Sequence, residues 1–164
     1  GMQWSPTRDL SLLLDYQRIG YAGVSALGNK PFDGSVRRGA VHGPGNGWKD
    51  MHVLKFGVRY QATSALRVSA GVSANSAAYA DAVTGDNLNS PSTFRRHFTV
   101  GLGYAPAGHT EWSIFYSLSP AHRTSGPSAL ASAVGMQLGV PNHLGRESLA
   151  TRQQSIGVQY SVRY

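Results

Sequence analysis

Apolar and polar residues alternate with a period of two in six stretches of this chain. In the second stretch, the apolar residues are Leu54, Phe56, Val58 and Tyr60, and the polar or small residues between them are Lys55, Gly57, Arg59 and Gln61. Successive side chains of a β-strand point to opposite faces, so this period predicts strands with one apolar face. The six predicted strands lie near residues 10–18, 52–61, 66–75, 96–104, 110–119 and 152–164.

The connections between these stretches alternate between short and long. Residues 5–9, 62–65 and 105–109 form short connections, whereas residues 20–51, 76–94 and 120–150 form long ones. Outer-membrane β-barrels have short periplasmic turns and long external loops. If the long loops are external, the last strand runs inward and ends at the periplasmic side. Residues 2–4 are a candidate remnant of one further strand.

The composition of the two faces separates a membrane barrel from a soluble β-sandwich, which also alternates. One face carries Gly, Ser, Gln, Lys and Arg, while aromatic residues lie at the ends of the apolar rows, as in a lipid-facing band with an aromatic girdle. We therefore expect an all-β, antiparallel up-and-down transmembrane barrel in a bacterial outer membrane. The terminal Tyr164 is then the aromatic signal read by the barrel assembly machinery.

The number of strands limits what the chain can form alone. About eight strands make the smallest membrane barrel, so about six give a partial barrel. Either the chain is the C-terminal part of a larger barrel, or several copies join. An open sheet edge in lipid leaves unpaired backbone groups that cost several kcal/mol each, which favours the fragment. No cleavable signal sequence begins the chain, so we expect the start of this exported protein to be missing or removed.

Composition excludes several other classes. No apolar run approaches the roughly 20 residues of a transmembrane helix, and the absence of cysteine excludes disulfides and thiolate metal sites. The net charge of +7 indicates anionic partners, which include nucleic acid, lipid phosphate and carboxylate ligands. Nucleic-acid binding needs basic and aromatic residues on one face, and here they lie on opposite faces.

Four segments also follow one another in a recognisable order. They are Tyr16-Gln17-Arg18-Ile19, Gly47-Trp48-Lys49-Asp50, Leu66-Arg67-Val68-Ser69-Ala70-Gly71-Val72, and the set Pro91, Arg95, Gly101 and Tyr104. In this order the chain resembles the FadL/TodX family of outer-membrane transporters for long-chain fatty acids and aromatic hydrocarbons. The chain departs from the family at Ser92, where an acidic residue is usual, and in two long loops.

The resemblance implies that residues 1–164 are the C-terminal portion of a fourteen-stranded barrel. It also implies an N-terminal hatch that plugs the barrel, capture of a hydrophobic ligand from outside, and release sideways through the wall. The N-terminal strands and the hatch would be absent from this chain.

Three basic residues are candidates for binding a ligand inside the barrel. Lys55, Arg59 and Arg67 lie in the polar rows of neighbouring strands, where they can pair with a ligand carboxylate. The alternative is ordinary lumen solvation, or pairing with acidic residues elsewhere in the barrel wall.

Further candidates lie at the external rim. Arg95, Arg96 and His97 begin the fourth strand there, and the external loops carry four more arginines, Arg37, Arg38, Arg123 and Arg146. They are candidates for ligand binding, or for contact with lipopolysaccharide phosphates. A short helix near Ser128 is a further candidate. The apolar face of this helix would consist of Leu130, Val134, Met136, Leu138 and Val140. This face would either contact incoming ligand or pack against its own loop.

The sequence gives little support for catalysis. The six histidines have no metal-ligand spacing, so we expect no catalytic residue, metal or cofactor. Residues 43–47 are glycine-rich but lack the Lys-Ser/Thr of a phosphate loop, and they predict a flexible loop. We therefore expect passive uptake of hydrophobic compounds across the outer membrane. The alternatives are a structural or adhesive barrel without a substrate and an outer-membrane lipid hydrolase.

Overall fold

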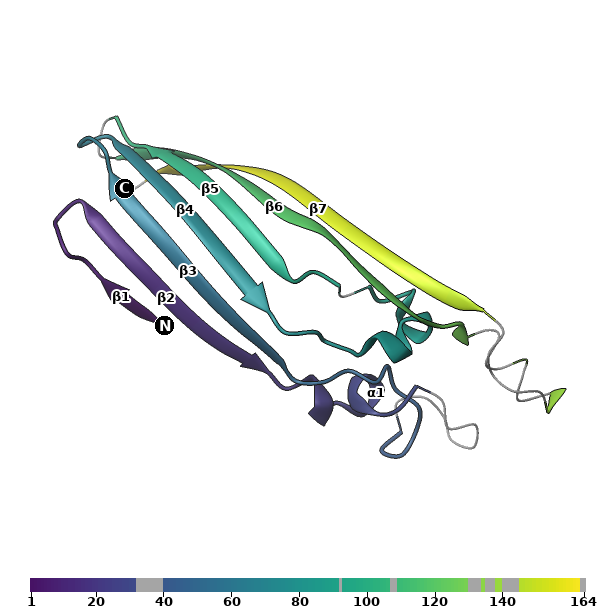
Figure 1. Ribbon diagram of the computed structural model, residues 1–164. Helices are drawn as coiled ribbons and strands as arrows, with labels where there is room; N and C mark the ends of the chain where they lie inside the picture. Colours follow the sequence, from purple (N-terminus) through teal and green to yellow (C-terminus); the bar gives the residue numbers. More distant parts are fainter. Residues whose placement is uncertain are drawn as a thin grey trace.

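The computed structural model describes residues 1–31, 40–91, 93–106, 109–129, 134, 138–139 and 145–162. It contains one antiparallel sheet of seven strands in chain order, each paired with its neighbours in sequence (Figure 1). The strands are β1 (Met2–Trp4), β2 (Leu10–Ile19), β3 (Met51–Gln61), β4 (Leu66–Asn75), β5 (Arg96–Tyr104), β6 (Thr110–Pro127) and β7 (Arg146–Val162). The predicted all-β, up-and-down partial barrel is confirmed.

The helical segments are short and lie in the connections. They are η1 (Tyr21–Gly23), α1 (Ser25–Gly28), η2 (Asp81–Val83) and η3 (Gly85–Asn87). No helix in the described part of the chain has the length and apolar character needed to cross a membrane.

The register turns the alternation of each strand into two continuous faces. Residues opposite one another share a face, because side chains alternate with the pleat. One row, running from β3 to β7, is Val58, Ala70, Val100, Tyr116 and Ile156. The next row is Gly57, Gly71, Thr99, Ser117 and Ser155. The sheet therefore has one apolar face and one polar face.

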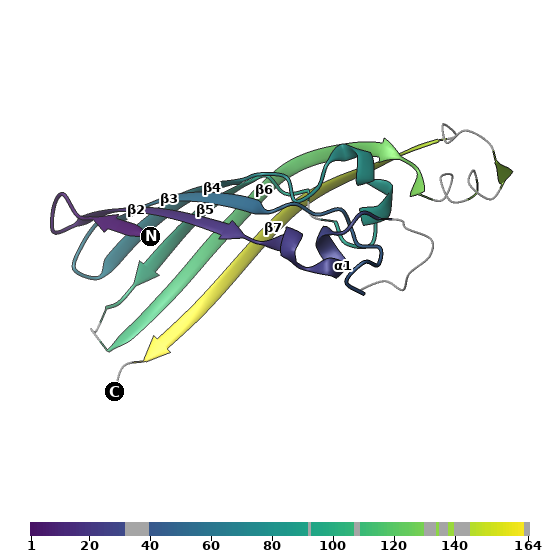
Figure 2. The same ribbon diagram turned by 90° about the horizontal axis from the view of Figure 1, so that it is seen from below.

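The apolar face is the more exposed of the two, the reverse of a sheet in a soluble protein. Val100 and Ile156 are 55% and 72% exposed, whereas Ser69 and Ser73 on the polar face are half-buried. The sheet is curved (Figure 2), and lower exposure of the polar residues is expected when they lie on its concave side. The polar face is therefore the inner face of the partial barrel.

The connections separate by length at the two ends of the sheet. The connections from β1 to β2, from β3 to β4 and from β5 to β6 start and finish at one end of the sheet, where β7 also finishes, and the long connections start and finish at the other (Figure 1). This is the arrangement expected from the sequence. Tyr164, the predicted assembly signal, lies outside the described residues.

The third long connection is shorter than predicted. Residues 120–150 were expected to form a loop, but β6 continues to Pro127 and β7 begins at Arg146. The register shifts between Ser119 and His122, so a β-bulge interrupts the pairing and pairing then resumes. Alternation is lost at the bulge, where Pro120 has no N–H to donate. Beyond it, the two strands pair only with each other among the described residues.

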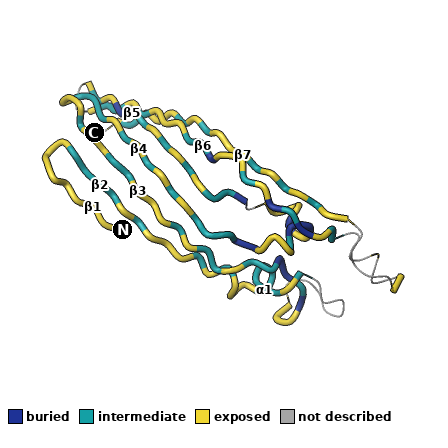
Figure 3. Tube along the Cα trace, viewed as in Figure 1, coloured by how far each residue is buried: buried dark blue, intermediate teal, exposed yellow. Residues whose placement is uncertain are grey.

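The packed core lies among the long connections, as Figure 3 shows by the buried positions at that end. Its buried residues include Ala78, Tyr79, Asn46, Thr84, Asn87 and Thr93. Residues 43–47 belong to this region, so the prediction of a flexible loop was wrong. Gly45 N donates to Lys30 O at 2.9 Å, and a Cβ on Gly45 would lie 2.6 Å from Ser25 O. Glycine is needed here for close packing rather than for mobility.

Candidate functional site

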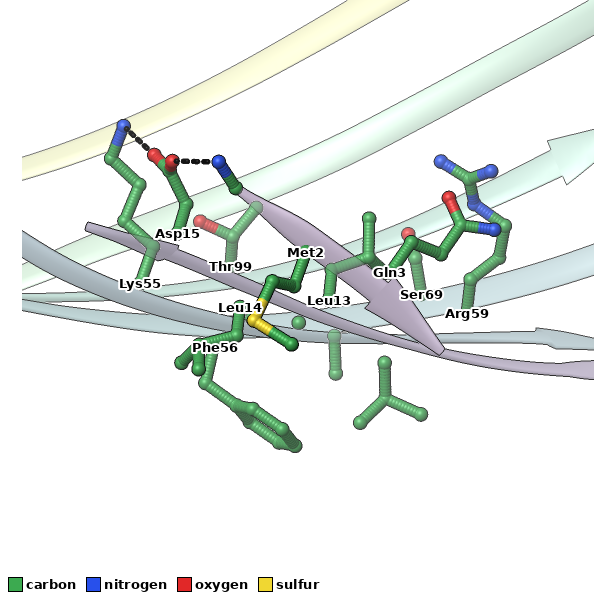
Figure 4. Close-up of a pocket in the computed structure, with 15 residues that line it drawn as sticks. Met2, Gln3, Leu13, Leu14, Asp15, Lys55, Phe56, Arg59, Ser69 and Thr99 are labelled. Atoms are coloured by element: carbon green, nitrogen blue, oxygen red, sulfur yellow. Dashed lines mark ion pairs between the residues drawn. The ribbon is translucent and has the colours of Figure 1, made fainter. Parts of the chain in front are cut away.

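The inner face contains a cavity of about 590 Å³ over β1 to β4 (Figure 4). Gly57 and Gly71 lie opposite each other in β3 and β4 and leave the sheet flat there. Leu13, the residue that breaks the alternation of β2, lies opposite Gly57 and adds an apolar side chain. Figure 4 shows Lys55 and Arg59 on the same side of the sheet as Leu13, with Phe56 on the other. This cavity therefore combines an apolar surface with two basic side chains.

The positive charge of Lys55 is already paired with neighbouring side chains. Its Nζ lies 3.2 Å from Asp15 Oδ2 and donates to Gln17 Oε1 at 3.4 Å. Lys55 therefore has less unmatched charge to offer a ligand than its place in the polar row suggested.

Arg67 is also paired. Its guanidinium donates to Glu111 across β5, and Ser113 Oγ donates to the same carboxylate oxygen at 3.1 Å. Gly103 lies between them, where a Cβ would be 3.0 Å from Arg67 Nη2 and 3.1 Å from Glu111 Oε1. The glycine therefore leaves room for an ion pair that ties β4 to β6, and Arg67 has a structural role.

Arg59 differs from the other two basic residues. It is exposed and lines the cavity, and among the described residues no carboxylate lies within ion-pair distance of it. An unpaired guanidinium on a concave surface can bind a carboxylate through two parallel hydrogen bonds. Of the three inner candidates, Arg59 is the one available to a ligand.

Phe115 is a large apolar side chain on the polar face. It lies opposite Gly101 in β5 and Gly157 in β7, and 47% of it is exposed. A Cβ on Gly157 would lie 2.1 Å from Phe115 Cε1, so the ring occupies the space that this glycine leaves. In the sequence, Phe115 alternates with Ile114 and Tyr116 and so falls in the polar row of the predicted strand 110–119. The available signal was a bulky apolar residue in that row.

Arg59 and Phe115 belong to the same row of the inner face. The register connects them through Ser69 and Gly101, which is three strand spacings, or about 14 Å along the wall. Only Ser69 and Gly101 lie between them, so no large side chain projects from the inner face between the guanidinium group and the ring. A ligand with one anionic end and an apolar body matches this row.

The predicted rim residues do not form one site. Arg96 lies two residues before the exposed Phe98 and shares the apolar face with it. His97 lies on the polar face, and its ring centroid is 6.0 Å from that of Phe94. Arg95 is half-buried beside them. Arg123 is exposed on β6, and Arg146 donates to Ser125 O at 3.4 Å. Arg37 and Arg38 lie outside the described residues.

The apolar loop candidates are only partly described. Val134 and Leu138 are 44% and 70% exposed, while Leu130, Met136 and Val140 lie outside the described residues. The expected helix near Ser128 and its apolar face stay predictions.

Two of the four segments that carried the family resemblance meet at the end of the sheet where the long connections lie. Arg18 donates to Asp50 Oδ2 through Nη2 at 2.6 Å and Nε at 3.1 Å, and the Ala22 amide donates to Asp50 Oδ1 at 3.0 Å. The hydrogen bond from Arg18 has the largest effect on the Asp50 carboxyl and, together with the one from Ala22, holds the pKa of Asp50 below its usual value. Trp48 Nε1 donates to Asn87 Oδ1 at 2.6 Å. The hydrogen bond from Trp48 to Asn87 therefore joins the long connection between β2 and β3 to the one between β4 and β5.

Within the described ranges, no group of three or more His, Asp or Glu side chains is placed to hold a metal ion.

Comparisons with known proteins identify relatives at the level of the fold. No protein-family model and no curated protein sequence matches the chain. Two solved structures match 99% of it: a TodX monoaromatic hydrocarbon channel deltaS2 mutant, with 14% identity and a TM-score of 0.63, and a TodX deltaS2S3 mutant monoaromatic hydrocarbon channel, with 15% identity and a TM-score of 0.64. The chain spans about a third, 34%, of each of those chains. The resemblance to the FadL/TodX family is thus confirmed for the fold.

Proposed function

We propose that this chain forms part of the wall of an outer-membrane barrel through which hydrophobic compounds enter passively. The observation that carries the proposal is the exposed apolar face of an up-and-down sheet whose inner face is polar. In water that face would be an aggregation hazard, whereas in a bilayer it is the lipid contact. The solved structures with the same fold are described as monoaromatic hydrocarbon channels, which supports transport rather than catalysis.

The wall needs further strands to close. Seven strands are described, and about eight make the smallest membrane barrel. The chain matches about a third of the TodX structures, which supports the proposal that it is one portion of a larger barrel. We propose that it is the C-terminal portion. The final strand would then be the segment that the assembly machinery recognises.

The proposed passage uses the inner row between Arg59 and Phe115. The ring of Phe115 offers an apolar surface to an aromatic or acyl group, and Arg59 offers a partner for a carboxylate. Long-chain fatty acids and aromatic hydrocarbons are therefore the two ligand classes that we propose, with binding and diffusion as the mechanism and no chemical step.

Uptake by cells that produce the protein tests this proposal. Cells are given a radiolabelled long-chain fatty acid or a radiolabelled monoaromatic hydrocarbon, and uptake is compared with that of cells lacking the protein. The expected result is faster uptake of at least one class. Equal rates for both classes with and without the protein would refute transport and favour a structural or adhesive barrel.

The role of Arg59 is tested separately, by Arg59→Met with Arg59→Lys as the matched control. Arg59→Met is expected to lower uptake of the carboxylate ligand about tenfold while leaving the neutral hydrocarbon unchanged, because a charge-assisted hydrogen bond contributes about 1.5–3 kcal/mol. Arg59→Lys retains the charge and is expected to retain most of the uptake. Equal losses for both ligands in Arg59→Met would assign Arg59 to the scaffold.

A further inference from the structure

A second cavity lies at the external rim, where β5 and β6 separate. Pairing of these strands ends at Phe98 and Leu118, and the β-bulge of β6 follows directly. The cavity has a volume of about 670 Å³ and is lined by Ala74, Asn75, Arg95, Arg96, Phe98, Pro120, Ala121 and His122. We call these eight residues the rim cleft.

The rim cleft is cationic and has no internal counter-charge. It contains two adjacent arginines, and none of its described lining residues is acidic. The ion pairs in the described part of the chain use Arg18, Lys55, Arg67 and the N-terminus, not Arg95 or Arg96. Arg95 lies one residue before β5 begins and so stands outside the strand alternation, and both arginines line the cleft. Two basic residues without carboxylates match a doubly charged anion such as a phosphate monoester.

The backbone that carries these arginines is fixed on both sides. The Asn75 amide donates to Arg95 O at 3.0 Å, and Ser119 Oγ donates to Arg96 O at 2.9 Å. Ser119 is 2% exposed and lies at the start of the bulge. The bulge therefore opens the cleft while the buried serine holds the edge of β5 in place, so the two basic residues are presented from a defined position.

The same cleft continues into the apolar face of the sheet. Arg96 lies directly opposite Ala74 and two residues from Phe98, which is 45% exposed on that face. Pro120 and Ala121 are exposed on the β6 side. A cation at the rim with an apolar surface running away from it along the strands matches an amphiphile with an anionic head and an acyl chain.

We propose that the rim cleft binds the phosphate group of an anionic lipid of the outer leaflet, with Arg95 and Arg96 on the phosphate and the acyl chain over Phe98. This assignment rests on the proposed function in one respect, that the apolar face contacts the outer membrane. It goes beyond that function because the occupant is a resident membrane lipid and not a transported compound.

Lipid binding by the detergent-solubilised protein tests the assignment. The probes are diphosphoryl lipid A, the same lipid with its phosphates removed, and inorganic phosphate. The variant Arg95→Gln/Arg96→Gln is compared with Arg8→Gln, which removes an exposed charge at the opposite end of the sheet. Affinity for diphosphoryl lipid A is expected to fall about tenfold or more in the double variant, and to change by less than about twofold in Arg8→Gln.

The other probes separate the possible ligands. Phe98→Ala is expected to weaken lipid A binding and leave that of inorganic phosphate unchanged. Equal affinity of the native protein for the lipid with and without phosphates would overturn the proposal, as would equal losses in the double variant and Arg8→Gln. Inorganic phosphate binding as tightly as lipid A would identify a free-anion site instead. Failure of hydrocarbon uptake would refute the proposed function and leave this binding measurement unaffected.

Discussion

A single arginine placed on either face of β5 tests which face contacts lipid. Val100 is the central residue of this nine-residue strand and is 55% exposed on the apolar face. It lies four residues from either end of the strand, which is about 13 Å along the strand and about 10 Å along the membrane normal for a tilt near 40°. An apolar band about 25 Å tall therefore places Val100 close to the bilayer midplane.

The expected cost of Val100→Arg follows from this depth. An arginine on the lipid face at the midplane costs about 2–4 kcal/mol. Thr99→Arg is the matched control because Thr99 is the neighbouring residue, points to the inner face and lines the inner cavity. Its charge would enter a hydrated lumen, so its expected cost is below about 1 kcal/mol. If the apolar face were in water, Val100→Arg would not be the more destabilising of the two variants, since an arginine on an exposed surface costs little.

The assay is denaturant unfolding of the protein folded into phosphatidylcholine vesicles, followed by tryptophan fluorescence. The free energies of unfolding of the native protein, Val100→Arg and Thr99→Arg are compared under the same conditions. A larger loss for Val100→Arg supports the assignment of the faces. Equal losses, or a larger loss for Thr99→Arg, would refute the reasoning that the exposed apolar face is the lipid-facing one.

Three further predictions concern the loops and the inner row. The pKa of Asp50 is lowered in the folded protein by Arg18, so its ion pair stabilises the loops above the ordinary carboxyl pKa and is lost as the pH falls through the lowered value. Protease resistance of the loops should therefore decrease below about pH 4, and Asp50→Asn should remove this pH dependence; an unchanged profile in the variant would contradict it. Gly157→Ala should displace the ring of Phe115, because the added Cβ would lie 2.1 Å from it. Uptake of aromatic ligand should then fall while the free energy of unfolding changes by less than about 1 kcal/mol, since a half-exposed ring can change rotamer; unchanged uptake would argue against a role for the ring. Asn87→Ala removes three side-chain hydrogen bonds at a fully buried position, and each polar group left unpaired costs about 1–3 kcal/mol. Hydrogen exchange should accelerate in the loops while the strands stay protected, and uniform acceleration would show that the loops and the sheet unfold together.

Alternation predicted the strands because a membrane sheet is built from a simple rule. In the proposed barrel, the row from Leu54 to Tyr60 is apolar because lipid would cover it, and the intervening row is polar because it would face the lumen. The alternation did not predict the strand residues that extend beyond this two-faced part of the sheet. Beyond Ser119, β6 pairs only with β7 among the described residues and packs beside the loops. The apolar–polar alternation of the sequence is lost there, although exposure still alternates along β6.

The candidate site was only partly predictable. The sequence placed Lys55, Arg59 and Arg67 on one face, but it gave no means of telling which of them is paired. Glu111 lies 44 residues from Arg67, and the two meet only through the register of three strands. Phe115 was similarly hidden, because its importance depends on two glycines brought opposite it by β5 and β7.

The loop core escaped prediction for a related reason. Residues 43–47 are rich in glycine, which in sequence indicates mobility. In the structure, Gly43, Gly45 and Asn46 are buried. Close backbone approach and local mobility both favour glycine, so composition alone does not separate them.

Spin labels at single cysteines in β4 show directly which face of the sheet contacts lipid, and the chain has no native cysteine to interfere. Nitroxide labels are placed in turn at Val68, Ala70 and Val72 on the apolar face and at Ser69 and Ser73 on the polar face, with the protein in lipid vesicles. Collision rates are measured with oxygen, which partitions into lipid, and with a water-soluble nickel complex. We expect a period of two, with the first three positions accessible to oxygen and the other two accessible to the nickel complex. Labels at all five positions with the same accessibility, or with the two sets exchanged, would contradict it.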